Sequence, residues 1–287
     1  MKSLWRRIRA ALRLAAAAVV TLFAYLMALA ATATGIFSER VRVRGQGRAY
    51  QFWSRGLCRI FGVRVTISGA SPRPPFLLVS NHLSYLDILT LGTSLPCVFV
   101  AKAEIDGWPI FGAICRSVNT IFIDRRLKRK LPEILRRIEA SLDAGQGIVI
   151  FPEGTSSAGA GVLPFRSSLL ELAVDLGRPV HYVAINYRVP EGEMPVHLSV
   201  AWWADMPLSE HLKNFLALPR IDCELCFGDE PVAAGDRKSL TAELEREVQR
   251  RFRPMVAAEE VERLLRLRQE SPEELPAVLR KPGDRFR

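Results

Sequence analysis

Apolar and polar residues follow two different patterns along the chain, and the first of them occupies the N-terminal end. Residues 14–36 contain no charged side chain, and at ~1.5 Å per residue a helix of this length can just cross a hydrocarbon core of about 30 Å. Residues 49–61 mix aromatic and aliphatic side chains with arginines, a pattern typical of a helix in the headgroup layer. Residues 1–62 are therefore predicted to anchor the chain to a membrane through one helix or a helix pair.

A cleaved signal peptide is the alternative interpretation of the N-terminal stretch, because its small residues resemble a cleavage site. We favour a retained anchor for two reasons. The apolar run is longer than a usual signal-peptide core, and a second basic cluster follows it at Arg40, Arg42, Arg44 and Arg48. Because basic residues flank the run on both sides, the positive-inside rule leaves its orientation open.

The rest of the chain alternates between short apolar runs that suit buried strands and amphipathic helical patterns. Strands are predicted at residues 64–68, 76–80, 98–101, 120–123, 147–151, 180–186, 196–201 and 222–227. Helices are predicted at residues 84–95, 130–144, 169–176, 208–217 and 257–268. Strands interleaved with helices predict an α/β fold, a mixed sheet flanked by helices. We assign residues 63–255 to this domain and residues 256–287 to a charged surface helix and a loose basic tail.

Charge and cysteine content narrow the class of protein. The chain has 40 Lys and Arg against 30 Asp and Glu, a net charge of +10, which suits an anionic membrane, a polyanionic substrate or nucleic acid. Nucleic acid is disfavoured, because the arginines cluster beside the apolar stretch and no nucleic-acid-binding motif is visible. The cysteines lie mostly in apolar runs and are interpreted as reduced core residues. Cys223 and Cys226 would point to opposite faces of a strand, so no metal site is predicted.

Candidate chemistry begins in the segment Asn81-His82-Leu83-Ser84-Tyr85-Leu86-Asp87, directly after a predicted strand. In one continuous helix His82 and Asp87 would lie ~140° apart and would not meet. If Ser84 instead caps the helix and Asp87 is its third residue, the carboxylate can reach back to the imidazole in the preceding turn. A histidine oriented by a carboxylate is the arrangement that a general base acting on a hydroxyl requires. The alternative is that Asp87 only caps the helix and His82 is a polar loop residue.

Four sequence blocks in a fixed order resemble the glycerolipid acyltransferase family that includes the 1-acylglycerol-3-phosphate acyltransferases. The first is Asn-His-x-Ser-x-x-Asp, in which four residues separate His from Asp, and the third is FPEGT at residues 151–155. The second lies at residues 121–125, after a match at 100–104, and a looser fourth block lies at 180–187. The resemblance covers residues 75–190 and implies a glycerol-3-phosphate acyltransferase-like fold.

The resemblance implies a role for each matching residue. His82 would deprotonate the acceptor hydroxyl, and Asp87 would hold the histidine. The alkoxide would attack an acyl thioester carried by CoA or acyl carrier protein without a covalent acyl-enzyme, which agrees with the absence of a GxSxG nucleophile motif. The residues implied for substrate binding are Glu153, Gly154, Thr155, Asp124, Arg125, Ser156 and Arg166. No metal is implied, and no cofactor beyond the acyl-donor substrate.

Ser156 departs from the family pattern, because many relatives carry an arginine there that can grip a phosphate with a fork of donors. Arg125, Arg126 or Arg166 could grip the phosphate instead, which would preserve 1-acyl-sn-glycerol 3-phosphate as the acceptor. Alternatively the acceptor lacks a phosphate monoester, as in relatives that acylate a lyso-ornithine lipid, a branch that the FPEGTSS segment resembles. We predict acyl transfer to a lysolipid, with the phosphate-bearing acceptor first and lyso-ornithine lipid as the alternative.

A lipid or thioester hydrolase is the less favoured class, and it predicts product formation without an acceptor lipid. The expected partners are membrane lipids and acyl-CoA or acyl carrier protein, and the oligomeric state is open. We place the protein at the inner membrane of the cell, with its site facing the cytoplasm, where acyl thioesters are found. This placement requires residues 14–36 and 49–61 to enter one leaflet together.

Overall fold

The computed structural model describes residues 2–107, 112, 115–116, 120–123 and 131–280. These residues form a seven-stranded sheet in the order β1-β7-β6-β2-β5-β3-β4. The strands are β1 (Val63–Ser68), β2 (Phe76–Ser80), β3 (Cys97–Lys102), β4 (Ile121–Ile123), β5 (Gly147–Ile150), β6 (Val180–Arg188) and β7 (Ile221–Phe227). Neighbouring strands are parallel except β6 and β7, which are antiparallel. The mixed sheet confirms the predicted fold class.

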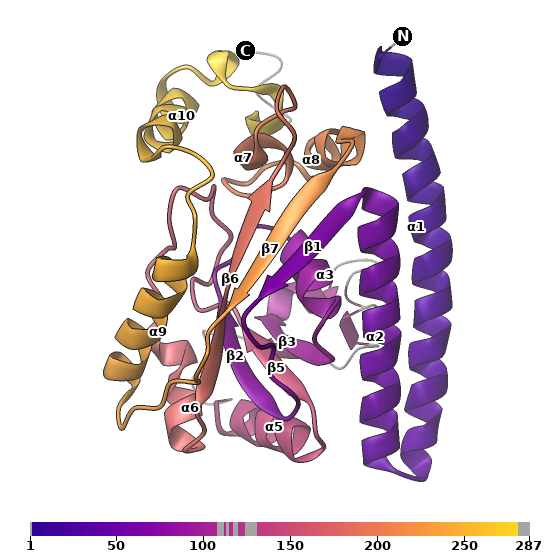
Figure 1. The fold of residues 1–287 in the computed structure, drawn as a ribbon, viewed down its shortest axis with the longest axis vertical. Helices are drawn as coiled ribbons and strands as arrows, with labels where there is room; N and C mark the ends of the chain where they lie inside the picture. The colour runs from indigo at the N-terminus through magenta and orange to yellow at the C-terminus, as the bar shows by residue number, and fades with distance from the viewer. Residues whose placement is uncertain (1, 108–111, 113–114, 117–119, 124–130, 281–287) are drawn as a thin grey trace.

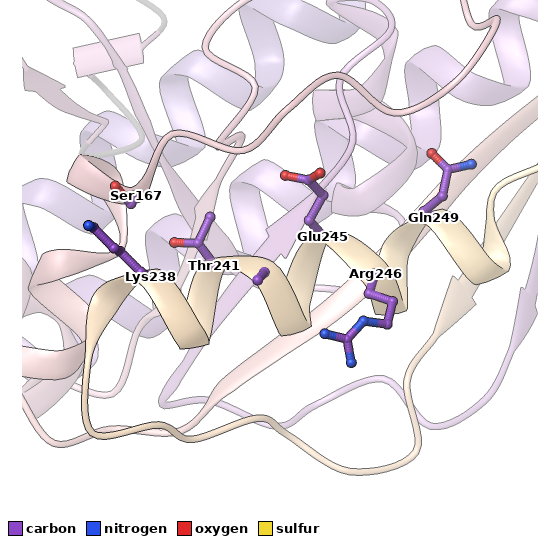
Figure 2. Close-up of a pocket in the computed structure, with 7 residues that line it drawn as sticks. Ser167, Lys238, Thr241, Glu245, Arg246 and Gln249 are labelled. Carbon is purple, nitrogen blue, oxygen red and sulfur yellow. The ribbon is translucent and has the colours of Figure 1, made fainter.

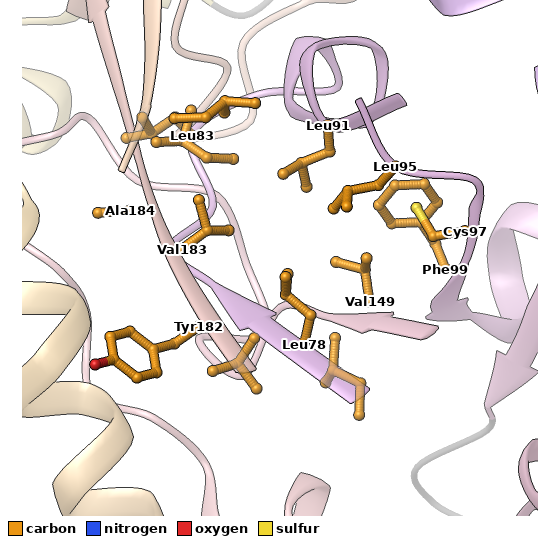
Figure 3. Close-up of a cluster of buried hydrophobic side chains, with 14 of the residues drawn as sticks. Leu78, Leu83, Leu91, Leu95, Cys97, Phe99, Val149, Tyr182, Val183 and Ala184 are labelled. Carbon is orange, nitrogen blue, oxygen red and sulfur yellow. The ribbon is translucent and has the colours of Figure 1, made fainter. Parts of the chain in front are cut away.

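The centre of the sheet is buried on both faces because its strands are continuous apolar runs. Every residue of β2 (FLLVS) and of β5 (GIVI) is buried, which is the pattern of a parallel strand covered by helices on both sides. Figure 3 shows Leu78, Val149 and Val183 of three neighbouring strands within one apolar cluster. Leu91 and Leu95, from the segment that follows β2, complete this part of the core.

Helices cover both faces of the sheet. They are α1 (Lys2–Ala33), α2 (Glu39–Phe61), α3 (Leu86–Gly92), α5 (Leu131–Asp143), α6 (Glu171–Asp175), α7 (Val196–Ser199), α8 (Leu208–Ala217), α9 (Arg237–Arg251) and α10 (Ala258–Glu270). In Figure 1, α9 lies against β6 on one side of the sheet, and α2 and α3 lie on the other side with α1 outermost. The helix predicted at residues 169–176 is reduced to the short α6.

The first two helices form an antiparallel hairpin (Figure 1). Ser38 caps α2 by accepting the Val41 N–H, and Gly62, with φ +73°, ends it in the left-handed conformation that favours glycine. Small residues let the two helices approach closely, since a Cβ added at Gly45 would lie 2.7 Å from the Ala31 Cβ. A helix pair, rather than a single helix, therefore precedes the sheet, and both helices begin earlier than their apolar patterns indicate.

Residues 196–201, predicted to be a strand, are not one. The helical turn α7 occupies most of this segment. The Ser199 hydroxyl donates to the carbonyls of Met194 and Pro195, and such local bonds offer the backbone an alternative to a sheet ladder. The bonds of the Ser199 side chain therefore favour a helical turn here, although the alternating apolar residues are typical of a strand.

The helix α9 was not expected from the apolar pattern, because most of its residues are charged. Its buried apolar side chains are Leu240, Leu244 and Val248, a spacing of four that places them on one face of a helix. Asp236 caps the helix by accepting the N–H groups of Lys238 and Ser239. The cap and the narrow apolar stripe are the two signals in the sequence that favour a helix here.

The segment after α10 differs from the expected loose tail as far as residue 280. Leu275, Val278 and Leu279 are buried in a second small apolar cluster. The cluster also contains Trp203 and Leu264. The end of the chain, as far as it is described, is therefore packed against the loop that follows α7.

Candidate active site

Two neighbouring parallel strands place the sequence motifs side by side. His82 follows β2, and the segment 151–157 follows β5, with Val79 of β2 paired to Ile150 of β5. Because the carboxyl ends of parallel strands meet at one edge of a sheet, ligands commonly bind there. The two strongest motifs of the sequence therefore converge on one site.

Asn81 fixes the start of the turn formed by residues 81–87, which we name the catalytic turn after the role predicted for His82 and Asp87. It is buried, and its side chain makes two hydrogen bonds to the backbone of Ile185 in β6: Nδ2 donates to the carbonyl at 3.0 Å and Oδ1 accepts the N–H at 2.7 Å. These bonds continue the β2–β6 ladder beyond its last pair, Ser80 and Val183. The turn is thus attached to the sheet before His82 begins.

The predicted contact between Asp87 and His82 is present. His82 Nδ1 lies 2.7 Å from Asp87 Oδ2, and the same oxygen accepts the N–H groups of Leu83 at 2.7 Å and Ser84 at 3.0 Å. A carboxylate can only accept, so Nδ1 carries the imidazole proton. Nε2 is then the lone-pair nitrogen, and it has no hydrogen-bond partner among the described residues. This is the geometry of a general base oriented by a second side chain.

Burial and stacking restrict the imidazole further. The side chain of Asp87 is fully buried, whereas that of His82 is 23% exposed. The His82 ring stacks on Phe151, with centroids 4.2 Å apart and planes 17° from parallel. The Nδ1 edge of the ring is therefore bound to Asp87 and one face is covered by Phe151, which leaves the Nε2 edge to meet a substrate.

The helix cap differs in detail from the prediction. The helix α3 begins at Leu86, not at Ser84, and the Ser84 hydroxyl accepts the Leu86 N–H at 3.3 Å. Asp87 does reach back to the Ser84 N–H, which is one half of a capping box. The motif therefore serves both to start a helix and to place a carboxylate beside the histidine.

Glu153 lies beneath the turn, with 2% of its surface exposed. Its Oε1 accepts the backbone N–H of His82 at 2.8 Å, and its Oε2 accepts that of Leu163 at 3.3 Å. Burial raises the pKa of Glu153 to about 8, although the two backbone bonds oppose this shift. Gly154, with φ +75°, turns the chain directly after it. The Glu153 carboxyl group, in the loop that follows β5, thus binds the backbone of the catalytic turn.

Ser156 is engaged with another loop. Its hydroxyl donates to the Trp202 carbonyl, while the Trp202 N–H donates to the Leu83 carbonyl at 2.8 Å. The Ser157 N–H donates to the His82 carbonyl at 3.0 Å. The loop after α7, the FPEGTSS segment and the catalytic turn are therefore joined through one set of hydrogen bonds.

The remaining predicted binding residues differ in where they lie. Thr155 and Arg166 are exposed, and the backbone N–H of Arg166 donates to the Pro152 carbonyl at 3.0 Å. Asp124 and Arg125 lie outside the described residues. Their roles in binding remain predictions.

Two further features of the site were not expected from the sequence. Tyr187, at the end of β6, donates its hydroxyl proton to Asp87 Oδ1 at 2.8 Å. Tyr85, within the turn, packs edge-on against Trp202, with ring centroids 5.9 Å apart. Tyr187 ends the loosely matched fourth block, which is the only sequence signal that points to it.

A surface hollow of about 560 Å³ lies against α9, and none of residues 81–87 lines it (Figure 2). Its lining residues are Ser167, Lys238, Thr241, Ala242, Glu245, Arg246 and Gln249. Glu245 accepts the Phe165 N–H at 2.7 Å, and Gln249 accepts the Val162 N–H at 3.1 Å. This face of α9 therefore supports the loop that carries Glu153. Within the described part of the chain, no cluster of three or more His, Cys, Asp or Glu side chains is placed to hold a metal ion.

Comparison with known proteins agrees with this geometry. A family model described as Acyltransferase matches residues 62–186. A lyso-ornithine lipid O-acyltransferase of Brucella abortus is 37% identical over 215 residues, which are 70% of this chain and 80% of that protein. The chain belongs to the acyltransferase family. A 1-acyl-sn-glycerol-3-phosphate acyltransferase of Neisseria meningitidis is 29% identical over 71% of this acyltransferase and 83% of its own length.

A solved structure shares the fold of this acyltransferase. The crystal structure of the 1-acyl-sn-glycerophosphate acyltransferase of Thermotoga maritima superposes with a TM-score of 0.63 at 19% identity. The match covers 87% of the present chain and 97% of that chain.

Proposed function

We propose that this acyltransferase moves a fatty acyl group from a thioester to the free hydroxyl of a lysolipid, with His82 as the general base. The observation that carries the proposal is the His82–Asp87 pair, in which Nδ1 is bound to a buried carboxylate and Nε2 remains able to accept a proton. Acyl-CoA or acyl carrier protein is the donor implied by the family resemblance. The acyl group passes directly from the thioester to the hydroxyl, and no covalent enzyme intermediate is required.

The reaction begins when Nε2 of His82 removes the proton of the acceptor hydroxyl as its oxygen attacks the thioester carbonyl carbon. The tetrahedral intermediate then collapses, and the carbon–sulfur bond breaks. The proton on Nε2 passes to the leaving thiolate, so that the products are an oxygen ester and a free thiol. Asp87 stabilises the transient imidazolium and holds its tautomer, and the stacked Phe151 ring restricts its tilt.

We infer that lyso-ornithine lipid is the preferred acceptor. Position 156 holds a serine whose hydroxyl is bound to the Trp202 carbonyl, so the guanidinium that grips phosphate in many relatives has no counterpart at this position. A lyso-ornithine lipid carries a carboxylate and an ammonium group but no phosphate monoester. The 37% identity to the Brucella enzyme supports the same acceptor.

The second candidate acceptor is 1-acyl-sn-glycerol 3-phosphate. It is favoured by Arg166, an exposed cation whose backbone is bound to the FPEGT segment at Pro152. Its side chain is free to approach a phosphate from the loop that carries Glu153. The similarity to the Neisseria enzyme supports this candidate.

An acceptor panel separates these candidates. Purified enzyme and the His82→Ala variant are given labelled acyl thioester with either lyso-ornithine lipid or 1-acyl-sn-glycerol 3-phosphate. We expect transfer to lyso-ornithine lipid, and a loss of about 10²- to 10⁴-fold in the variant, which is the usual contribution of a general base. Transfer to the phosphate-bearing lipid alone would favour the second candidate. Thioester hydrolysis without transfer to either lipid would overturn the transferase proposal.

The hairpin is proposed to hold the enzyme in one leaflet of the inner membrane, with the site facing the cytoplasm. One helix of the described chain, Leu4–Ile36, is long and apolar enough to cross a membrane. Its exposed large apolar side chains include Leu12, Val19, Leu22, Phe23, Leu26 and Leu29. Because α2 returns along α1, the N-terminal part of α1 lies beside the C-terminal end of α2, where Arg13 donates to the Leu218 carbonyl at 2.6 Å. Protection of the sheet domain from protease in sealed inside-out vesicles would contradict this placement.

A further inference from the structure

A buried tyrosine contacts the carboxylate that orients the candidate base. Tyr187 belongs to β6 and is 1% exposed. Its hydroxyl donates to Asp87 Oδ1 at 2.8 Å. The other oxygen, Oδ2, faces His82 and the backbone of the turn. The two oxygens of the Asp87 carboxylate thus bind different groups: Oδ1 binds Tyr187, and Oδ2 binds His82 and the backbone of the turn.

The direction of this hydrogen bond follows from the groups involved. A carboxylate can only accept, so the phenolic proton lies on Tyr187 and points at Asp87. Burial, and next the charge of Asp87, raise the pKa of Tyr187 well above its ordinary value of 10, which keeps the proton in place. The Thr90 hydroxyl lies 3.2 Å from the Tyr187 oxygen and 3.2 Å from the Asp87 carbonyl. The Thr90 hydroxyl therefore lies between the phenol and the backbone of Asp87.

The strand that carries Tyr187 also holds the other end of the turn. Asn81, at the start of the turn, is bonded to the backbone of Ile185, and Asp87, at its end, is bonded to the side chain of Tyr187. These two positions of β6 are two residues apart, the repeat of a strand. The strand therefore fixes the separation between both ends of the segment that contains His82.

We propose that Tyr187 is a positioning residue for the transfer reaction. It holds the Asp87 carboxylate in the orientation that aims Oδ2 at His82 Nδ1. A hydrogen bond to the charged form of an acid favours that form, and one to a charged group is roughly twice as strong as one between neutral groups. The inference rests on the proposed roles of His82 and Asp87 and is independent of which lysolipid is the acceptor.

The test compares two buried tyrosines that each lose one hydroxyl. Tyr187→Phe removes the donor to Asp87, while Tyr50→Phe removes a buried hydroxyl that donates to the Ile88 carbonyl, in the helix that also carries Asp87. For each variant, kcat and KM are measured from pH 5 to 9 with the acceptor that the wild-type enzyme uses, and thermal unfolding is recorded.

For Tyr187→Phe we expect kcat to fall about tenfold, with the KM for each substrate changed less than about twofold, because the lost bond is one to a charged group. The acidic limb of the kcat profile should move to higher pH by about one unit, since the carboxylate loses a donor that favours its ionised form. Tyr50→Phe should lower the melting temperature and leave the acidic limb where it is in the wild type.

An acidic limb that stays in place in Tyr187→Phe, with a melting temperature lowered as in Tyr50→Phe, would make Tyr187 structural only and overturn the inference. If Tyr187→Phe does not fold, 3-fluorotyrosine incorporated at position 187 gives the test in the opposite direction, because its more acidic phenol is a stronger donor to Asp87 Oδ1, and an acidic limb that does not move to lower pH there overturns the inference too. His82→Ala, measured alongside, separates the role of the proposed base from the role of Tyr187. If it retains transfer, the proposed base is wrong, whereas its inactivity together with an unmoved limb in Tyr187→Phe refutes only the role of the tyrosine.

Discussion

The catalytic turn and the helical hairpin both belong to the same sheet domain, but they are attached to it by different kinds of contact. The turn is held by hydrogen bonds from buried polar side chains. Those of Asp87 and Glu153 bond to the backbone of the turn, that of Asn81 to the backbone of Ile185, and that of Tyr187 to Asp87. The hairpin is held mainly by apolar packing and close approach of small residues, with arginine contacts near the N-terminal end of α1. Its polar bonds from α2 include those of Tyr50, Gln51 and Arg55 to backbone carbonyls in and just after α3.

This difference suits what each region is proposed to do. Directional hydrogen bonds fix atoms to within tenths of an ångström, which a proton transfer between His82 and a hydroxyl requires. Apolar packing is non-directional and proportional to area, so the outer face of α1 can exchange water for lipid without disturbing the fold. The comparison predicts that single polar substitutions will be costly in the turn and mild in the hairpin.

The largest expected effect on stability is that of Asn81→Ala. The variant leaves both the N–H and the carbonyl of Ile185 buried without the Asn81 bonds, and each unsatisfied group costs about 1 to 3 kcal/mol. We expect the free energy of unfolding to fall by about 2 to 6 kcal/mol, measured by denaturant titration in detergent. Asn214→Ala is the matched control, because Asn214 makes a single long bond of 3.5 Å to the Leu198 carbonyl. Equal losses in the two variants would mean that the turn does not depend on its polar network.

How far the sequence predicts these two regions also differs, and for a physical reason. Local rules predict β2, β5 and the contact of Asp87 with His82, because continuous apolar runs and helix capping act over a few residues. The same rules locate the apolar helix of the hairpin. They cannot find the bond between Tyr187 and Asp87, which joins residues 100 positions apart. Nor can they show that Ser156 is bound to Trp202, since that contact depends on how a distant loop folds back.

Glu153 gives a second way to examine the turn, through the pH dependence of stability. The pKa of Glu153 is raised from an ordinary 4.5 to about 8 in the folded protein, so the unfolded chain releases this proton first as the pH rises. The stability that the neutral acid contributes is complete below pH 4.5 and is lost as the pH rises through 8. The loss is at most about 1.4 kcal/mol per pH unit within that window.

Glu153→Gln cannot ionise, so its stability relative to the wild type should rise between pH 5 and pH 8. The measurement is the free energy of unfolding of both proteins at several pH values in this range. Glu262→Gln, an exposed position in the middle of α10, is the control and should show a constant difference. If the difference in the free energy of unfolding between Glu153→Gln and wild type is as constant with pH as that of the control, Glu153 is ionised in the folded protein throughout this range.

The smallest expected effect lies in the hairpin, at the polar contacts that link α1 to α8. The Arg13 guanidinium donates to the carbonyls of Leu216 at 2.9 Å, Leu218 at 2.6 Å and Pro219 at 3.4 Å. Arg13→Ala removes these bonds, and we expect a loss of about 1 to 2 kcal/mol. This loss should appear as faster hydrogen exchange in α1, with exchange in β2 and β5 unchanged, because the hairpin can open without the sheet.

Arg7→Ala is the matched control for Arg13→Ala, since Arg7 is exposed on the same helix and carries the same charge. If α1 exchanges faster in Arg13→Ala alone, the arginine acts through its bonds to the end of α8. If both variants loosen α1 equally, the arginines of this helix act only through their charge, and the Arg13 bonds do not attach α1 to α8. The two regions would then differ more sharply than the Arg13 contacts indicate, because the three directional bonds of α1 to the end of α8 would contribute nothing to its attachment.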